Sequence, residues 1–236
     1  MSDSEEFTWV SWYCSQKGKE FFCEVREWYY TDNFNLTGLS NFIPYYSLAL
    51  SLIRSEEYNR DFDQLSQEQI AIVDRAAEVL YGLIHARFIV TTTGIQLMLK
   101  KYRKAKFGTC PRVYCENQPT LPIGLSDIVG QYSLKLFCPR CQRVYIPTNP
   151  EHRKIDGAYF GTTFAHSLLN SNKDVLPFQP THRYIPRIYG FKLSKGVTKY
   201  RKSKKVVDLL EQKNTEKNEE IKKEIEKEKE KEKEKK

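Results

Sequence analysis

The chain has 236 residues, of which 40% are hydrophobic and 13% aromatic, and its formal net charge is +8. This composition is sufficient for a hydrophobic core in one large domain or two smaller ones. The first six residues are acidic and lack the basic and apolar regions of a signal peptide. The longest apolar stretch, around residues 45–53, is far shorter than the roughly 20 residues that cross a bilayer. We therefore expect an intracellular globular protein without a membrane segment.

The positive charge is unevenly distributed. Residues 211–236 contain ten lysines and ten glutamates, so this part adds no net charge. The excess is densest at residues 192–205, which hold seven lysines and arginines and no acid. Such a segment is suited to nucleic acid, to an acidic protein face or to anionic lipid. It is equally consistent with a solvated linker, and the charge pattern alone does not separate these possibilities.

Residues 1–104 are predicted to form an all-α domain. Ser66 and Gln69 have the spacing of a capping box, which predicts that a long amphipathic helix begins there and runs to about residue 90. Apolar residues follow at helical spacing and are expected to form its buried face: Ile70, Val73, Ala77, Leu80 and Ile84.

Three further helices are expected in this domain. Thr93 and Gln96 repeat the capping arrangement, which predicts a helix over residues 94–104 with a basic C-terminal end. Shorter helices are expected at residues 9–16 and 45–54, the second entered through Pro44.

The cysteine spacing is the most informative pattern in the chain. Two pairs are separated by 22 residues, as C-x4-C and then C-x2-C, and they consist of Cys110, Cys115, Cys138 and Cys141. This pattern predicts one structural Zn²⁺ per chain, held tetrahedrally in a zinc ribbon with no open position for substrate. The alternatives are two disulfides or four unrelated cysteines. The other two cysteines, Cys14 and Cys23, are expected to be buried apolar residues.

The zinc ribbon is expected to span residues 105–165, with strands at 134–137 and 144–146. Val113, Leu125 and Val144 are apolar residues close to the cysteine pairs. Because so small a module buries little surface alone, these residues predict packing against a second copy of the chain. Packing against the helical domain is the alternative.

Residues 166–205 contain three scattered prolines and little periodicity, so we expect an extension that wraps the surface. Within it, residues 187–192 place Tyr189 and Phe191 around a glycine. This pattern predicts a turn that displays two aromatic anchors to a partner protein, or else two rings that pack back onto the body. Residues 206–236 are rich in lysine and glutamate and are expected to form a disordered tail or an exposed helix. The fold class is thus α+β.

No motif for catalysis is found. The chain lacks a P-loop, a dinucleotide-binding glycine motif and the kinase catalytic loops. Its histidines, His85, His152, His166 and His182, are scattered, and His85 is expected to be a core residue of the long helix. We therefore expect a protein that is not an enzyme.

Several segments closely resemble the regulatory beta subunit of casein kinase II. The longest are residues 110–119 (CPRVYCENQP) and 121–128 (LPIGLSDI). Others are residues 20–26 (EFFCEVR), 34–39 (FNLTGL), 81–87 (YGLIHAR), 156–162 (DGAYFGT) and 189–192 (YGFK). The resemblance extends in order over residues 5–193.

The resemblance implies a non-catalytic regulator of a Ser/Thr protein kinase. It implies a homodimer formed through the zinc ribbon, within a tetramer of two catalytic and two regulatory subunits. The family's zinc ligands correspond to the four paired cysteines, and its anchors for the catalytic subunit correspond to Tyr189 and Phe191. Such a subunit stabilises the kinase and modulates its choice of protein substrates. We expect it in the cytoplasm and the nucleus.

Two parts of the resemblance are weaker. The family's acidic loop corresponds to residues 55–63, which have only four acids and include Arg60, so polyamine control is in doubt; the acids are Glu56, Glu57, Asp61 and Asp63. The N-terminal phosphorylation site is kept in part, at Ser2 and Ser4. The alternative function is that of a zinc-ribbon protein that binds nucleic acid through residues 192–205.

Overall fold

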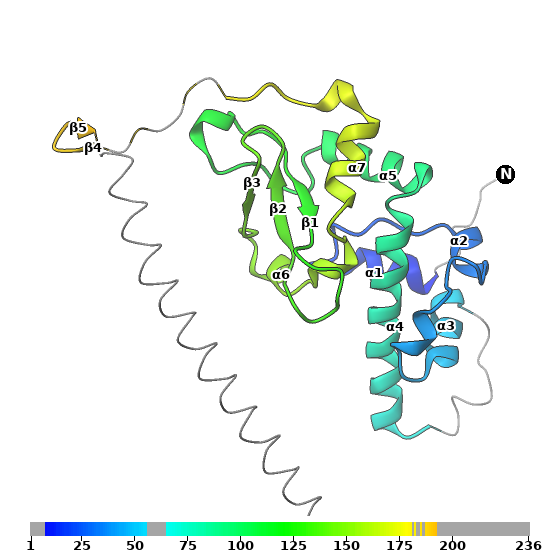
Figure 1. Ribbon diagram of the computed structural model, residues 1–236. Coiled ribbons are helices and arrows are strands. Elements are labelled where there is room, and N and C mark those ends of the chain that lie inside the picture. Colours follow the sequence, from blue (N-terminus) through cyan, green and yellow to red (C-terminus); the bar gives the residue numbers. More distant parts are fainter. Residues whose placement is uncertain (1–7, 56–64, 181, 183–184, 186, 193–236) are drawn as a thin grey trace, which may run out of the picture. The chain divides into compact units, whose positions relative to one another are not determined.

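The computed structural model (Figure 1) describes residues 8–55, 65–180, 182, 185 and 187–192. The described residues up to 180 belong to one compact unit, and those from 182 onward belong to a second. The first unit combines helices with a small antiparallel sheet, and the second contains a two-stranded hairpin. The division into four parts stays a prediction.

The N-terminal part of the first unit is helical between residues 9 and 103. Its helices are α1 Trp9–Ser15, α2 Glu27–Thr31, the 3-10 turn η1 Leu39–Asn41, α3 Tyr46–Arg54, α4 Gln67–Phe88 and α5 Thr92–Arg103. The capping box at the start of α4 is confirmed, because Ser66 Oγ accepts from the backbone of Gln69 and the Gln69 side chain accepts from the backbone of Ser66.

One predicted helix start was wrong. Helix α5 begins two residues earlier than expected, and Thr91 rather than Thr93 is its cap, since Thr91 Oγ1 accepts from the backbone of Gly94. Gly94 lies against the carbonyl of Phe88, six residues earlier, so the chain turns tightly between α4 and α5 and Thr91 stands at the cap position. Helix α3 starts at Tyr46, one residue after its predicted start, and Pro44 precedes it as expected.

The sheet contains three antiparallel strands in the order β1-β2-β3: Leu121–Ile123, Lys135–Cys138 and Arg143–Tyr145. Strands β2 and β3 lie within one residue of the predicted positions. Strand β1, which pairs Leu121 with Phe137, was not predicted. Strand β1 contains Pro122. This proline is tolerated there because β1 lies at the edge of the sheet.

After the sheet come α6 Pro150–Arg153, η3 Gly157–Tyr159, α7 Phe164–Ser171 and η4 Lys173–Val175. The sequence analysis missed α7, expecting only a surface extension from residue 166. Its Phe164, Ala165, Leu168 and Leu169 are buried at i, i+1, i+4 and i+5, and the helix packs against β1. Eight residues are too few for such a pattern to be recognised without knowing what the helix covers.

A single hydrophobic core connects the helices with the sheet. It includes Phe22 and Tyr81 from the helical part, Leu121 and Leu134 from the sheet region, and Phe160 after it. The His85 ring packs at an angle against Phe22 and edge-on against Phe160 and is fully buried, as predicted. Ile70, expected on the buried face of α4, is exposed instead. No described helix has the length and hydrophobicity of a membrane span.

Candidate metal centre and aromatic hairpin

The four paired cysteines are brought together by two tight turns. Cys110 follows the loop after α5, and Cys115 ends the 3-10 turn η2 (Val113–Cys115). Cys138 ends β2, and the backbone N–H of Gln142 donates to the carbonyl of Cys138 at 2.8 Å to close the second turn. In the first turn the backbone N–H of Cys115 donates to the carbonyl of Arg112 at 2.9 Å, so a backbone hydrogen bond closes each turn that carries a pair of thiols.

The sulfur atoms form a compact cage. The four Sγ atoms all lie within 4.8 Å of one another, and those of Cys110 and Cys141 are 3.9 Å apart. Four sulfurs at about 2.3 Å from a tetrahedral zinc ion lie about 3.8 Å from each other. All six cysteines are free and described, so the alternatives of disulfides and of unrelated cysteines are wrong. The cluster is positioned to bind a metal ion, and its geometry is consistent with zinc.

The pKa values of the thiols explain why a cation suits this cage. Burial and neighbouring thiols raise the pKa of Cys115 to about 11, and burial also raises the pKa of Cys138. Burial acts against ionisation of Cys141 too, but hydrogen bonds from Tyr145 and the other thiols lower its pKa to about 7. Four thiolates so close together repel each other, and a divalent cation removes this penalty.

Two side chains support the cage and were not identified from the sequence. The hydroxyl of Tyr145 lies 3.3 Å from Cys141 Sγ, and Tyr145 packs against the cysteine cluster. The guanidinium of Arg140 donates to the carbonyl of Cys115 at 3.2 Å and to Glu116 at 3.0 Å. Arg140 lies inside the second cysteine pair and Tyr145 follows it by four residues, and this closeness in the chain was the available signal. These contacts fix the ligand loops, as outer-shell partners of metal ligands commonly do.

The apolar residues near the cysteines are exposed. The side chain of Val113 is 85% exposed, and Leu125 and Val144 are also exposed. Packing against the helical domain, the alternative left open by the sequence, is therefore not what the chain adopts. Each of these three residues therefore leaves apolar side-chain surface uncovered.

The second unit is a hairpin built from β4 Arg187–Ile188 and β5 Phe191–Lys192. Tyr189 and Gly190 form its two-residue turn with φ values of 48° and 84°. Positive φ at both positions is typical of the tight turns that match the twist of antiparallel strands. Tyr189 is 98% exposed and Phe191 is 79% exposed, so the predicted turn displays both rings.

The remaining site predictions lie outside the described residues. They concern Ser2 and Ser4, the acids Glu56, Glu57, Asp61 and Asp63, and the basic segment beyond Lys192. Of the histidines near the ribbon, His152 pairs with Glu20 at 2.9 Å, and neither it nor His166 belongs to a metal-binding cluster of described residues.

The fold and the site define a protein with a four-cysteine cluster positioned to bind a metal ion and a separate aromatic hairpin. Residues 8–192 match the family described as "Casein kinase II regulatory subunit", and the chain belongs to this family. The family is the regulatory subunit of the kinase and not the catalytic one.

Curated relatives agree with this assignment. The chain is 47% identical to "Casein kinase II subunit beta" of Dictyostelium discoideum, over 82% of this chain and 71% of the relative. It is 46% identical to "Casein kinase II subunit beta'" of Drosophila melanogaster, over 82% and 87% respectively. It is 48% identical to "Casein kinase II subunit beta" of Schizosaccharomyces pombe, over 85% of each chain. The alternative of a nucleic-acid-binding protein finds no support in these comparisons.

Proposed function

We propose that this chain acts as the regulatory subunit of a casein kinase II holoenzyme. Two copies join through their zinc ribbons, each with one Zn²⁺, and the hairpin of each copy docks one catalytic subunit. The assembly is thus a tetramer of two catalytic and two regulatory chains. Binding stabilises the kinase and modulates which protein substrates it phosphorylates.

The exposed hairpin rings carry the proposal. Tyr189 and Phe191 lie on a hairpin whose backbone is held by strand pairing, so the backbone that carries both rings is ordered before a partner arrives. A partner that buries them does not have to order the segment first, and less free energy is lost on binding. Each buried aromatic anchor contributes on the order of 2 kcal/mol or more. The hairpin also lies inside the matched family segment, which ends at residue 192.

The proposed dimer rests on the surface beside the metal. Val113 lies between the first two cysteines and Val144 in the strand after the second pair, so bound Zn²⁺ holds both in one rigid unit. Together with Leu125 they supply exposed apolar surface. Burying such surface against a second copy is favourable at about 25 cal/mol per Å².

Co-expression tests the proposed docking. The full chain is purified with a casein kinase II catalytic subunit, and bound kinase and its thermal unfolding midpoint are measured. We expect Tyr189→Ala/Phe191→Ala to lower bound kinase at least tenfold and to abolish the stabilisation of the kinase. Phe178→Ala is the matched control, because Phe178 is 94% exposed but lies outside the hairpin. Undiminished binding by the double variant contradicts the proposal.

Three further proposals rest on sequence and family membership. The acidic loop at residues 55–63 attracts basic substrate segments through Glu56, Glu57, Asp61 and Asp63. Arg60 in the same loop weakens this attraction. Ser2, with Glu5 three residues later, and Ser4, followed by Glu5 and Glu6, are phosphorylated by an acidophilic kinase. The subunit works in the cytoplasm and the nucleus.

A further inference from the structure

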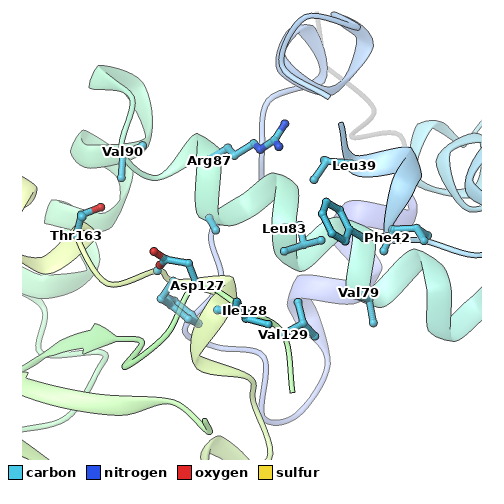
Figure 2. A pocket seen from close by; sticks show the side chains of 15 residues that line it. Leu39, Phe42, Val79, Leu83, Arg87, Val90, Asp127, Ile128, Val129 and Thr163 are labelled. Carbon is cyan, nitrogen blue, oxygen red and sulfur yellow. The ribbon is translucent and has the colours of Figure 1, made fainter. Parts of the chain in front are cut away.

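The charged residues that line the open cavity beside α4 are bonded within the chain. Figure 2 shows these two residues, Arg87 and Asp127, in the lining. Arg87 Nη1 donates to the carbonyl oxygens of Asn35 at 2.8 Å and Thr37 at 3.0 Å. Asp127 accepts from the backbone and the hydroxyl of Thr162 at 2.8 Å and 3.1 Å. This cavity therefore presents one cation and one anion that already have partners, and it selects no ligand.

The C-terminal end of α5 differs, because its cations outnumber the acids around them. Residues 88–115 contain six lysines and arginines and no acid. Four of these cations are exposed at the end of the helix, and we call them the α5 basic end: Lys100, Arg103, Lys104 and Lys106. The three lysines of this set form no ion pair with any described residue.

The backbone holds the α5 basic end in place. Arg103 and Lys104 follow Lys100 by three and four residues, so these three side chains share one face of the helix. The backbone N–H of Lys106 donates to the carbonyl of Lys101 at 3.1 Å, which places Lys106 beside the last turn. The backbone that carries all four cations is therefore ordered before a partner binds.

The helix end itself does not occupy these side chains. A helix C-terminus attracts cations, and lysine side chains near it can bond the last carbonyl groups. In α5 the carbonyls of Lys100, Lys101 and Tyr102 already accept backbone N–H groups. The ammonium groups of the α5 basic end thus remain available to a partner.

Acids close to the α5 basic end neutralise only part of its charge. Asp174 lies 2.8 Å from Arg103 Nη2, and it is the only acid in α5 and η4. Glu20 lies in the loop whose carbonyl groups accept from α5, but its carboxylate is 2.9 Å from His152 Nε2. A partner that supplies carboxylates is therefore complementary to the remaining lysines.

The makeup of this surface favours an acidic peptide over other anions. Tyr102 and Phe107 are buried, so residues 96–108 offer no exposed ring on which a nucleic-acid base could stack. Duplex DNA is commonly bound through about six to ten phosphate contacts, more than four cations supply. Every exposed residue from 96 to 106 is polar, so the apolar face that inserts into a membrane is missing.

The spacing of the lysines fits an extended acidic chain. Lys100 and Lys104 are separated by about 6 Å along the helix axis, at 1.5 Å per residue. In an extended peptide, alternate side chains lie on the same side and are about 7 Å apart. Carboxylates at alternate positions of such a peptide can therefore meet both lysines at once.

We propose that the α5 basic end is a docking site for an acidic segment of a partner protein, with aspartates or glutamates at alternate positions of an extended stretch. Residues 211–236 of this chain are a poor occupant, because their lysines and glutamates cancel. The site uses no residue of the hairpin or of the proposed dimer surface, so it goes beyond the proposed function.

Carbodiimide crosslinking with the full chain tests where an acidic segment binds. The probe is a labelled peptide of 10 residues in which glutamates alternate with serines, and the matched probe has glutamines in place of the glutamates. Carbodiimide joins a carboxylate to a lysine amine that it contacts, and mass spectrometry identifies the lysine. This readout separates the α5 basic end from the basic segment at residues 192–205.

Fluorescence anisotropy measures the affinity of the same probes. Lys100→Glu/Lys104→Glu reverses two charges of the α5 basic end. Lys17→Glu/Arg75→Glu is the matched control, because it changes the net charge equally at two other exposed cations. Thermal unfolding checks that both variants keep the parent fold.

We expect the glutamate probe to crosslink to Lys100, Lys104 or Lys106 and the glutamine probe to crosslink to none of them. Lys100→Glu/Lys104→Glu is expected to weaken binding of the glutamate probe at least fivefold, and the control less than twofold. Crosslinks confined to lysines beyond residue 192, or equal weakening by both variants, overturn the proposal. Tighter binding of a 10-nucleotide single strand or of phosphatidylserine vesicles, lost in Lys100→Glu/Lys104→Glu, overturns it as well, since the surface would then serve nucleic acid or lipid.

Discussion

The ring of Tyr159 lies directly against the backbone of Gly82 in the middle of α4. A β-carbon at Gly82 would lie 2.3 Å from Cδ1 of that ring, which is well inside van der Waals contact. The contact joins the long helix to the segment after the sheet, so the helical part and the metal-binding part are held together at a position that only glycine allows.

Gly82→Ala is therefore expected to destabilise the chain by about 1–3 kcal/mol, the usual cost of overpacking a core. At an exposed position of a helix the same change would stabilise by about 1 kcal/mol. Urea unfolding at constant zinc measures the difference. In a Tyr159→Leu background the ring is gone, and the penalty of Gly82→Ala is expected to shrink or reverse. An equal penalty in both backgrounds contradicts the contact.

Buried His85 gives the fold a pH dependence of its own. Its Nε2 accepts from the backbone of Cys23 at 3.2 Å, and its Nδ1 lies 2.8 Å from the carbonyl of Tyr159, so the neutral ring with a proton on Nδ1 satisfies both contacts. Burial lowers the pKa of His85 from 6.5 to about 4.

The unfolded chain thus gains a proton near pH 6.5 while the folded chain does not until about pH 4. Stability from this group is complete above pH 6.5 and is lost as pH falls to about 4, by up to about 3 kcal/mol. Urea unfolding across this range is expected to be less steeply pH-dependent in His85→Gln than in the parent. Identical pH profiles of stability for His85→Gln and the parent would show that His85 does not cause this pH dependence.

Loss of one cage sulfur is expected to release the metal and separate the dimer. Structural zinc contributes about 10 kcal/mol or more to small modules of this kind, so Cys138→Ser should leave the ribbon without its main source of stability. Metal analysis and sedimentation measure the two effects. Cys14→Ser, outside the cage, should keep both metal and dimer. A metal-free chain that remains dimeric contradicts the proposed role of the ribbon.

The apolar surface beside the cage can be tested without disturbing the metal. Val113→Glu adds a charge where the proposed dimer buries an exposed valine, and the dimer dissociation constant is expected to rise at least a hundredfold, or about 2.7 kcal/mol. Zinc content should stay unchanged. Leu176→Glu, at another exposed apolar position, serves as control. Equal dimerisation of both variants would place the interface elsewhere.

Features predicted well from the sequence depend on neighbours in the chain. The cysteine pairs are recognisable because each pair closes a short turn, and the Tyr189-Gly190 turn is recognisable because positive φ favours glycine there. The start of α4 was predicted correctly because Ser66 and Gln69 cap the same turn. In each case the residues that stabilise the feature lie within a few positions of one another.

Tertiary contacts decided the rest. Helix α7 is stabilised by the core it covers and not by its own eight residues. Strand β1 forms despite Pro122 because β2 offers it an edge position. Ile70 fits the apolar spacing of α4 in the sequence, but only packing shows that the core leaves it exposed.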